Sequence, residues 1–243
     1  MVRLAVGDDR TRVHAVTSLK TLVQSSQAIL LDFDGPVCHL FSGLPAHEIA
    51  EKIRSFLLDQ GAVLPESMMS ESNPLAFLGW VGLVAPHLLS DVEEIQTDAE
   101  IEAARLVEPT PGVAEMLRSA TPLDLPVVIV TNNSAEAVET FLDRHLLGSS
   151  VTGIASRIKG RPDLMKPDAH LVLKGVEIAG HPAAACLLVG DSPTDMQAGI
   201  KAGVRCVGYA KRPARITELS EAGADFVVQS MESVAEVVTS LRA

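Results

Sequence analysis

The sequence is poor in cysteine, which limits its redox chemistry. Its 243 residues include three cysteines, Cys38, Cys186 and Cys206, and no C-x-x-C pair. Three such thiols are too few for a disulfide framework. Cys186 and Cys206 lie in apolar runs and are interpreted as core residues, and we expect Cys38 to be a small buried thiol rather than a nucleophile. This usage is typical of a reducing cytosol, so a cytoplasmic location is expected.

Long apolar segments are also lacking. The longest, residues 75–89, is broken by Gly79, Gly82 and Pro86 and is too short to span a bilayer. The first ten printed residues contain no apolar stretch long enough for a signal peptide. We therefore expect no membrane partner.

Basic residues are few relative to acidic ones. Twenty Lys and Arg face 31 Asp and Glu, which gives a net charge of −11. Such a surface repels phosphate backbones, so no nucleic-acid partner is expected. An anionic substrate would need a local cation, either a metal ion or a well-placed lysine. The patterns G-x-x-x-x-G-K-[ST], G-x-G-x-x-G after a strand, G-x-S-x-G and H-E-x-x-H are absent as well.

What the chain does contain is a regular alternation of short apolar runs and helical patterns. Strands are predicted at residues 28–33, 126–130, 152–155, 185–189, 204–209 and 225–228. Helices are predicted at residues 111–120, 134–147, 168–179, 193–202, 214–222 and 231–241, and more weakly at 13–23. Strands alternating with helices indicate an α/β fold with a doubly wound, Rossmann-like parallel sheet.

Residues 37–108 interrupt this alternation because they contain no β-branched strand run. They predict helices from Pro45 to just before Gly61, at 74–83 and at 90–107. We expect a small helical cap over residues 37–108. It would be inserted into a discontinuous core formed by residues 1–36 and 109–243.

The first predicted strand ends in two acids, Asp32 and Asp34, followed by Gly35. Ligands of parallel sheets lie outside the carboxyl ends of the strands, so both acids fall where a site is expected. With Phe33 turned into the core, they can face one substrate, or a turn after Phe33 can lean Asp34 over the site. A neutralised carboxylate can form an acyl-phosphate, and a second acid can protonate the leaving group. A lone D-x-D also fits a solvated turn, so the other motifs decide.

Three more positions carry candidate residues. Thr131 and Asn132 follow an apolar strand, where groups at a helix start can hold a phosphate oxygen. The alternative is that Asn133 or Ser134 simply caps the helix. Lys166 lies in a loop, where it could balance charge or only face solvent. Asp191 ends another strand and with Asp32 suits Mg²⁺. Asp195 completes a capping-box pattern, which it can combine with support of a metal.

Taken in order, D-F-D-G-x-V, V-T-N, K-P-D and G-D-S-x-x-D resemble the four motifs of the haloacid dehalogenase-like hydrolase superfamily. The insert resembles the helical cap of that superfamily. The resemblance implies that Asp32 is a nucleophile that becomes an aspartyl-phosphate. It implies that Asp34 is the general acid and base, and that its carbonyl also ligates Mg²⁺.

The same resemblance assigns the remaining candidates. Thr131, with Asn132, would bind the phosphoryl group, and Lys166 would balance its charge. Asp191 would ligate the metal, and Asp195 would either ligate it or support the ligands.

The second acid also indicates the branch of the superfamily. True dehalogenases and phosphonatases lack it, so Asp34 favours phosphate esters. The pattern resembles phosphoglycolate-phosphatase-like members, although Pro36 stands in place of their threonine, and Cys38 and His39 occupy the next motif positions. We expect a Mg²⁺-dependent phosphatase of a small phosphorylated metabolite, in an oligomeric state that the sequence leaves open. The alternatives are a phosphosugar mutase, a non-hydrolytic phospho-accepting signalling module, and a degenerate binding protein.

Overall fold

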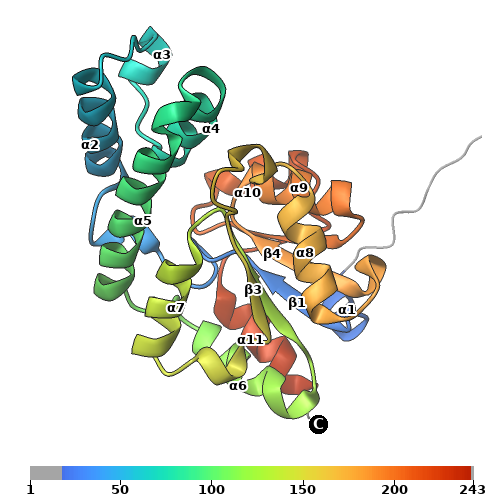
Figure 1. The fold of residues 1–243 in the computed structure, drawn as a ribbon. Coiled ribbons are helices and arrows are strands. Elements are labelled where there is room, and N and C mark those ends of the chain that lie inside the picture. Colours follow the sequence, from blue (N-terminus) through green and yellow to red (C-terminus); the bar gives the residue numbers. More distant parts are fainter. Residues whose placement is uncertain (1–17, 242–243) are drawn as a thin grey trace, which may run out of the picture.

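The computed structural model describes residues 18–241 and contains a six-stranded parallel sheet with helices on both faces (Figure 1). Its strands are β1 Ala28–Leu31, β2 Val127–Val130, β3 Gly153–Ala155, β4 Cys186–Gly190, β5 Arg205–Tyr209 and β6 Phe226–Val228. The order across the sheet is β3-β2-β1-β4-β5-β6. The predicted doubly wound sheet is confirmed, and its direction of winding reverses between β1 and β4.

Side-chain alternation along the strands explains why both faces are covered. In β1, Ile29 and Leu31 enter one apolar cluster, whereas Ala28 and Leu30 enter the other. The first cluster is covered by α1 Leu19–Gln24, α6 Val113–Ala120, α7 Ala135–Arg144 and α11 Met231–Ser240. The second is covered by α8 His170–Ala179, α9 Pro193–Ala202 and α10 Ala214–Glu221, which lie together in Figure 1. Residues 13–17 of the weakly predicted first helix lie outside the described part.

The segment between β1 and α6 is helical, as predicted. It contains α2 Ala46–Asp59, α3 Glu66–Met69, α4 Pro74–Val84 and α5 Leu89–Leu106. These helices share a separate apolar cluster that includes Ile53, Phe77 and Val92. The short α3 was not predicted, because four residues are too few to establish a helical period.

Both connections of this segment lie together at the edge of the sheet. The backbone N–H of Thr110 donates to the carbonyl of Val37 at 2.9 Å. The Thr110 hydroxyl donates to the carbonyl of Gly35 at 2.8 Å. The chain therefore leaves and re-enters the core at one place.

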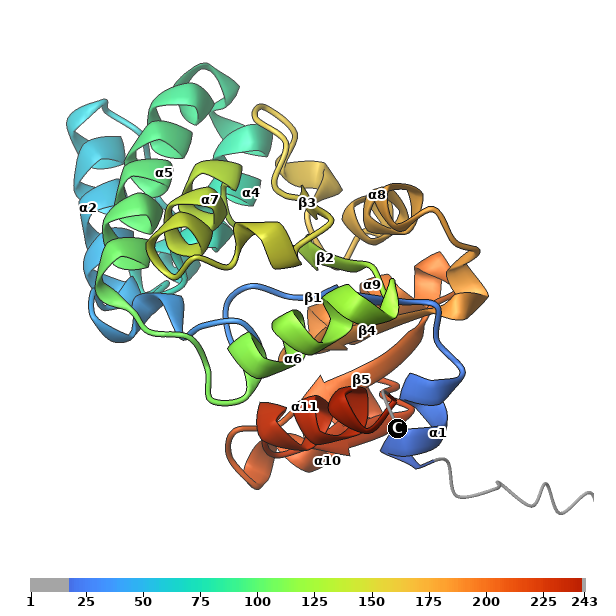
Figure 2. The same cartoon turned by 90° about the horizontal axis from the view of Figure 1, so that it is seen from below.

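Helix α5 is shared between the insert and the core. It lies beside α7 in both views (Figure 1 and Figure 2). Its last turns place Ala103 and Ala104 in the apolar cluster on the α7 face of the sheet. Within residues 18–241, no helix combines the length and hydropathy needed to cross a membrane.

Candidate active site

The predicted site residues meet at one edge of the sheet. Leu31 of β1 pairs with Ile129 of β2 and with Val189 of β4, so the residues that follow these three strands are neighbours. This edge is the point where the winding reverses, which is where open α/β sheets bind ligands. A cavity of about 1190 Å³ lies there. All seven predicted site residues line it: Asp32, Asp34, Thr131, Asn132, Lys166, Asp191 and Asp195.

Lys166 is the central cation of this site. Its Nζ lies 2.8 Å from Oδ1 of Asp32 and 2.6 Å from Oδ1 of Asp195, and it donates to the carbonyl of Val130 at 3.0 Å. Burial favours the neutral amine, but Asp195 and Asp32 outweigh it and raise the pKa of Lys166 above its usual range. The lysine is therefore a buried, charged group and not a surface residue.

The acids carry more negative charge than Lys166 neutralises. Oxygen atoms of Asp32, Asp191 and Asp195 all lie within 4.8 Å of one another. Burial and the charge of Asp195 raise the pKa of Asp32 from 3.8 to about 7, despite the attraction of Lys166. Burial, Asp195 and Asp34 raise the pKa of Asp191 to about 7 in the same way. An additional cation would relieve this repulsion.

Asp34 is placed by a sharp turn immediately after the strand. Phe33 is fully buried in the core, as predicted, and Gly35 adopts a φ of +113°. The Asp34 carboxylate accepts the backbone N–H of Leu40 at 2.9 Å. Burial and the neighbouring Asp32 raise the pKa of Asp34 to about 7. A carboxyl group in this state can both donate and accept a proton near neutral pH.

Asp195 contacts both the loop at Asp191 and Ser192 and the side chain of Lys166. Its Oδ2 accepts the backbone N–H groups of Asp191 and Ser192 at 3.1 and 3.0 Å and the Ser192 hydroxyl at 2.7 Å, so the predicted capping box is present. Its Oδ1 faces the Lys166 ammonium. Both oxygens are thus engaged, whereas within residues 18–241 no hydrogen bond reaches the Asp191 carboxylate.

The carboxylate oxygens of this site are suitable ligands for a divalent cation. The cluster of three aspartates offers only oxygen atoms, the ligands that hard cations prefer. Asp191 has a free carboxylate, and Asp32 has one oxygen that does not face Lys166. The residues present are therefore compatible with a divalent metal.

The loop after β2 binds the Lys166 loop directly. Asn132 donates from Nδ2 to the carbonyl of Lys166 at 3.1 Å and accepts the Lys166 N–H at Oδ1 at 2.8 Å. The buried hydroxyl of Thr131 donates to Oδ1 of Asn133 at 2.9 Å. Ser134 caps α7, which confirms the capping alternative for that residue.

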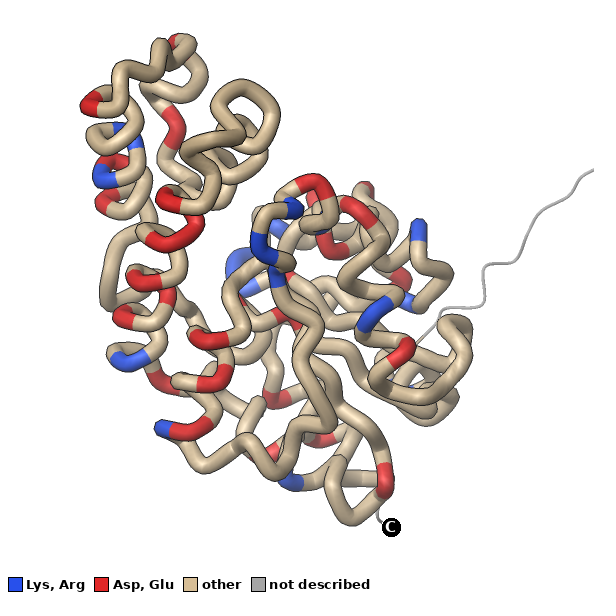
Figure 3. Tube along the Cα trace, in the orientation of Figure 1, with Lys and Arg blue, Asp and Glu red and all other residues tan. Residues whose placement is uncertain are grey.

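Two groups near the site were not identified from the sequence. The first is a buried ion pair between Glu100 of α5 and Arg157, with 2.9 Å between Oε1 and Nη1. Acidic positions recur along α5 (Figure 3), so the sequence did not distinguish Glu100 from the solvated ones. Its spacing of four from Gln96 and from Ala104, both buried, was the available signal.

The second group is basic and lies around the mouth of the cavity. Lys201, Arg212 and Arg215 line the same space as the aspartates. Arg215 donates to the backbone carbonyl of Asp191 at 2.6 Å, and Lys201 to that of Pro167 at 2.8 Å. The exposed acids Asp163 and Asp168 line the same space, so side chains of both charges surround the site in a chain of net charge −11.

Fold and site together define a doubly wound α/β protein with a carboxylate cluster and a buried lysine at the point where its sheet reverses. The chain belongs to the haloacid dehalogenase-like hydrolase family, whose sequence model matches residues 27–203. The family indicated by the four motifs is thereby confirmed.

Individual relatives agree with this assignment. Phosphoglycolate phosphatase of Pseudomonas syringae pv. syringae (strain B728a) is 31% identical over 175 residues, 61% of this chain, and the chain spans only 62% of its length. Hexitol phosphatase A of Escherichia coli (strain K12) is 26% identical over 86% of this chain and 93% of its own. The structure of CbbY from Rhodobacter sphaeroides in complex with phosphate has a TM-score of 0.63 at 17% identity, covering 86% of this chain and 96% of its own.

Proposed function

We propose that the protein is a Mg²⁺-dependent phosphatase that hydrolyses a small phosphorylated metabolite through an aspartyl-phosphate. The main observation in its favour is the Lys166 ammonium, which lies between Asp32 and Asp195 beside the free carboxylate of Asp191. The relatives named as phosphatases support the same chemistry.

Asp32 and Asp34 carry the two chemical steps. A carboxylate oxygen of Asp32 bonds to phosphorus while the ester oxygen departs with a proton from Asp34. Asp34 then takes a proton from water, whose oxygen attacks the phosphoryl group and releases inorganic phosphate and free Asp32. A pKa of about 7 suits Asp34 to both transfers.

The other residues of the site would bind the phosphoryl group and neutralise its charge. Thr131 and Asn132 lie on the cavity wall, where they would contact the phosphoryl oxygens, and Lys166 would offset their charge. Asp32, Asp191 and the carbonyl of Asp34 would hold Mg²⁺. When bound, it would neutralise charge on the transferred group. Asp195 is assigned to holding Lys166 and the Asp191 loop, because both of its oxygens are engaged.

The proposed cap, residues 37–108, restricts the substrate to a small molecule. Asn73 and Ala76 of this segment line the same cavity as Asp32. Lys201 and Arg215 are bonded to backbone carbonyls, and the acids Asp163 and Asp168 line the same cavity. Arg212 is therefore the cation that would contact a second acidic group of the substrate, such as that of a phosphorylated hydroxy acid or a sugar bisphosphate.

The test is phosphate release from a panel of small phosphate esters, with Mg²⁺ and after chelation. We expect turnover that requires the metal and is lost in Asp32→Asn but kept in Asp143→Asn, which changes an exposed acid on α7. A mutase would instead return the phosphoryl group to the substrate, and a signalling module would accept it once without turnover. Metal-independent turnover, or full turnover in Asp32→Asn, would contradict the proposal.

A further inference from the structure

Glu100 of α5 is a buried acid whose partners are nearly all outside the insert. Its Oε1 accepts Nδ2 of Asn133 at 3.0 Å and Nε2 of Gln96 at 2.8 Å. Its Oε2 accepts the backbone N–H of Ser134 at 2.8 Å. Burial alone would raise the pKa of Glu100, but Arg157, Gln96 and the backbone N–H of Ser134 outweigh burial and lower it. Glu100 is therefore a fixed negative charge beside the loop that follows β2.

Arg157 links Glu100 to Asn132 through hydrogen bonds to both residues. Its two terminal nitrogens lie 2.9 and 3.2 Å from the Glu100 oxygens. The nitrogen at 2.9 Å also donates to the backbone carbonyl of Asn132 at 2.8 Å, and the other to the hydroxyl of Thr97 of α5 at 3.1 Å. The guanidinium fork thus binds α5 and the Asn132 backbone at the same time.

Asn132 in turn fixes the backbone of Lys166 through its two amide hydrogen bonds. The contacts therefore run without a gap from Glu100 through Arg157 and Asn132 to Lys166, whose Nζ reaches Asp32. A continuous set of bonded groups of this kind can place a catalytic side chain within the tolerance that catalysis requires.

We propose that Glu100 is a positioning residue of the insert, which places Lys166 against Asp32 through Arg157 and Asn132. The inference rests on the proposed function for its kinetic consequence, but its structural consequence does not need turnover. It makes α5 part of the fixed frame of the site. If the proposed cap closes over the site, the helices that move are then α2, α3 and α4, while α5 stays in place.

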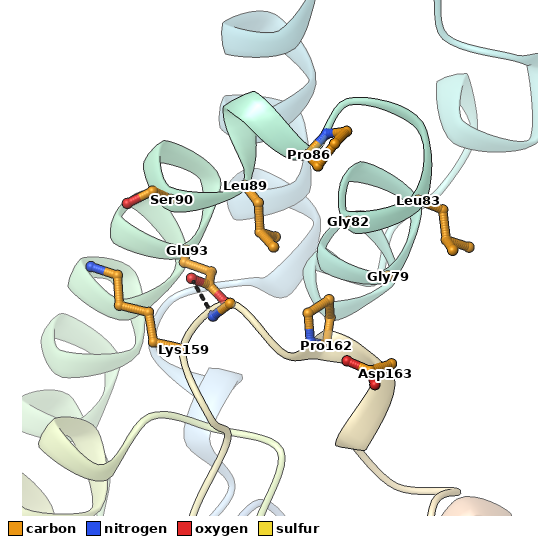
Figure 4. A pocket seen from close by; sticks show the side chains of 11 residues that line it. Gly79, Gly82, Leu83, Pro86, Leu89, Ser90, Glu93, Lys159, Pro162 and Asp163 are labelled. Carbon is orange, nitrogen blue, oxygen red and sulfur yellow. Dashed lines mark hydrogen bonds between the residues drawn. The ribbon is translucent and has the colours of Figure 1, made fainter.

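The first experiment compares Glu100→Gln with Glu93→Gln. Glu93 is a matched control, because it is also buried on α5 and both of its oxygens accept the N–H of Gly160, at 2.8 and 3.1 Å (Figure 4). It lines the same small cavity as Arg157, but within residues 18–241 no hydrogen bond joins it to the loop that follows β2. We expect Glu100→Gln to lower kcat at least tenfold with KM within twofold. Glu93→Gln should keep kcat within twofold.

Hydrogen–deuterium exchange gives a readout that does not depend on activity. In Glu100→Gln, amide exchange should rise at residues 131–134 and at Lys166, while β4 stays protected. In Glu93→Gln, the rise should be confined to the Gly160 loop. An unchanged exchange pattern at Lys166 would overturn the inference even if no phosphate ester proves to be a substrate.

Chemical rescue covers the case in which Glu100→Gln does not fold. A cavity of about 410 Å³, lined by Arg157, Thr97 and Ser134, gives small solutes access to this position. Millimolar guanidinium should restore at least a fifth of the wild-type kcat to Arg157→Ala, and urea should not. Absence of rescue in a folded variant would overturn the inference. So would equal losses of kcat in Glu93→Gln and Glu100→Gln that follow their losses of stability, since these indicate a purely structural role.

Discussion

A methyl group on Gly35 would lie 2.6 Å from the carboxyl carbon of Asp191. Two loops that are remote in the sequence therefore approach each other so closely that no side chain fits between them. Gly35 also has a φ of +113°, a conformation that side chains disfavour. The turn that places Asp34 and the approach of Asp191 thus depend on the same glycine.

Gly35→Ala is therefore expected to displace Asp191 as well as to strain the turn. We predict a loss of about 1–3 kcal/mol in the free energy of unfolding. Divalent-cation affinity should also weaken, since Asp191 is a proposed ligand. Gly61→Ala is the matched control, because Gly61 also has a positive φ but nothing within 4 Å of an added methyl group. Gly61→Ala should lose stability but keep its affinity for the divalent cation. Unchanged affinity in Gly35→Ala, measured by calorimetry, would contradict the proposed role of Asp191.

Lys166→Ala removes the cation that separates Asp32 from Asp195. We predict a fall in kcat of about 10²–10³-fold, the usual cost of losing one charge-stabilising group. The protein should remain folded but be less stable, because the buried side chains of Asp32 and Asp195 lose the ammonium group that both contact. Lys159→Ala, an exposed lysine outside this cavity, is the control and should retain wild-type rates. Steady-state kinetics with circular dichroism separates lost chemistry from lost folding.

The raised pKa values predict how stability changes with pH in metal-free buffer. Asp32 titrates near 7 in the native state and near 3.8 when exposed, so the native state binds more protons between these values. The free energy of unfolding should therefore fall as pH rises from about 4 to about 7. Asp32→Asn removes part of this repulsion and should raise Tm at pH 8, by about 2–4 °C for each kcal/mol gained.

Mg²⁺ should reverse the order of thermal stability, so that the wild type becomes more stable than Asp32→Asn. It stabilises whichever native state binds it, and the wild type has the larger set of carboxylate ligands. Thermal unfolding of both, at pH 5 and pH 8 with and without Mg²⁺, tests this. A wild-type protein that is more stable than Asp32→Asn at pH 8 in chelator would show that Lys166 more than compensates the repulsion.

The sequence predicted the strands and the acids well because both are local signals. Asp32 and Asp191 each end an apolar run, and the order of such runs is sufficient to bring their ends together. The pairing of Glu100 with Arg157 could not be predicted, because it joins residues 57 positions apart on a helix and an irregular loop. Gly35 was expected for its turn, but its closeness to Asp191 depends on how two loops pack.

Arg212 offers the most direct test of substrate class. It lines the cavity and is exposed, and within residues 18–241 its guanidinium group has no hydrogen-bond or ion-pair partner. A free guanidinium there can reach a second acidic group of the substrate, for which charge-assisted hydrogen bonds are the strong ones. We predict that the wild type prefers 2-phosphoglycolate to 2-hydroxyethyl phosphate, which replaces the carboxylate with an alcohol at nearly the same size.

In Arg212→Ala this preference should fall about tenfold, the effect of roughly 1.4 kcal/mol, while kcat/KM for 2-hydroxyethyl phosphate stays unchanged. The remaining preference of the wild type should also weaken as salt is added, because exposed charges are screened. Arg105→Ala is the control, since Arg105 is exposed on α5 and does not line this cavity. Equal losses for both substrates would assign Arg212 to the phosphoryl group instead. An unchanged ratio of the two kcat/KM values would mean that Arg212 does not bind the second acidic group. Substrate selection would then depend on the proposed cap.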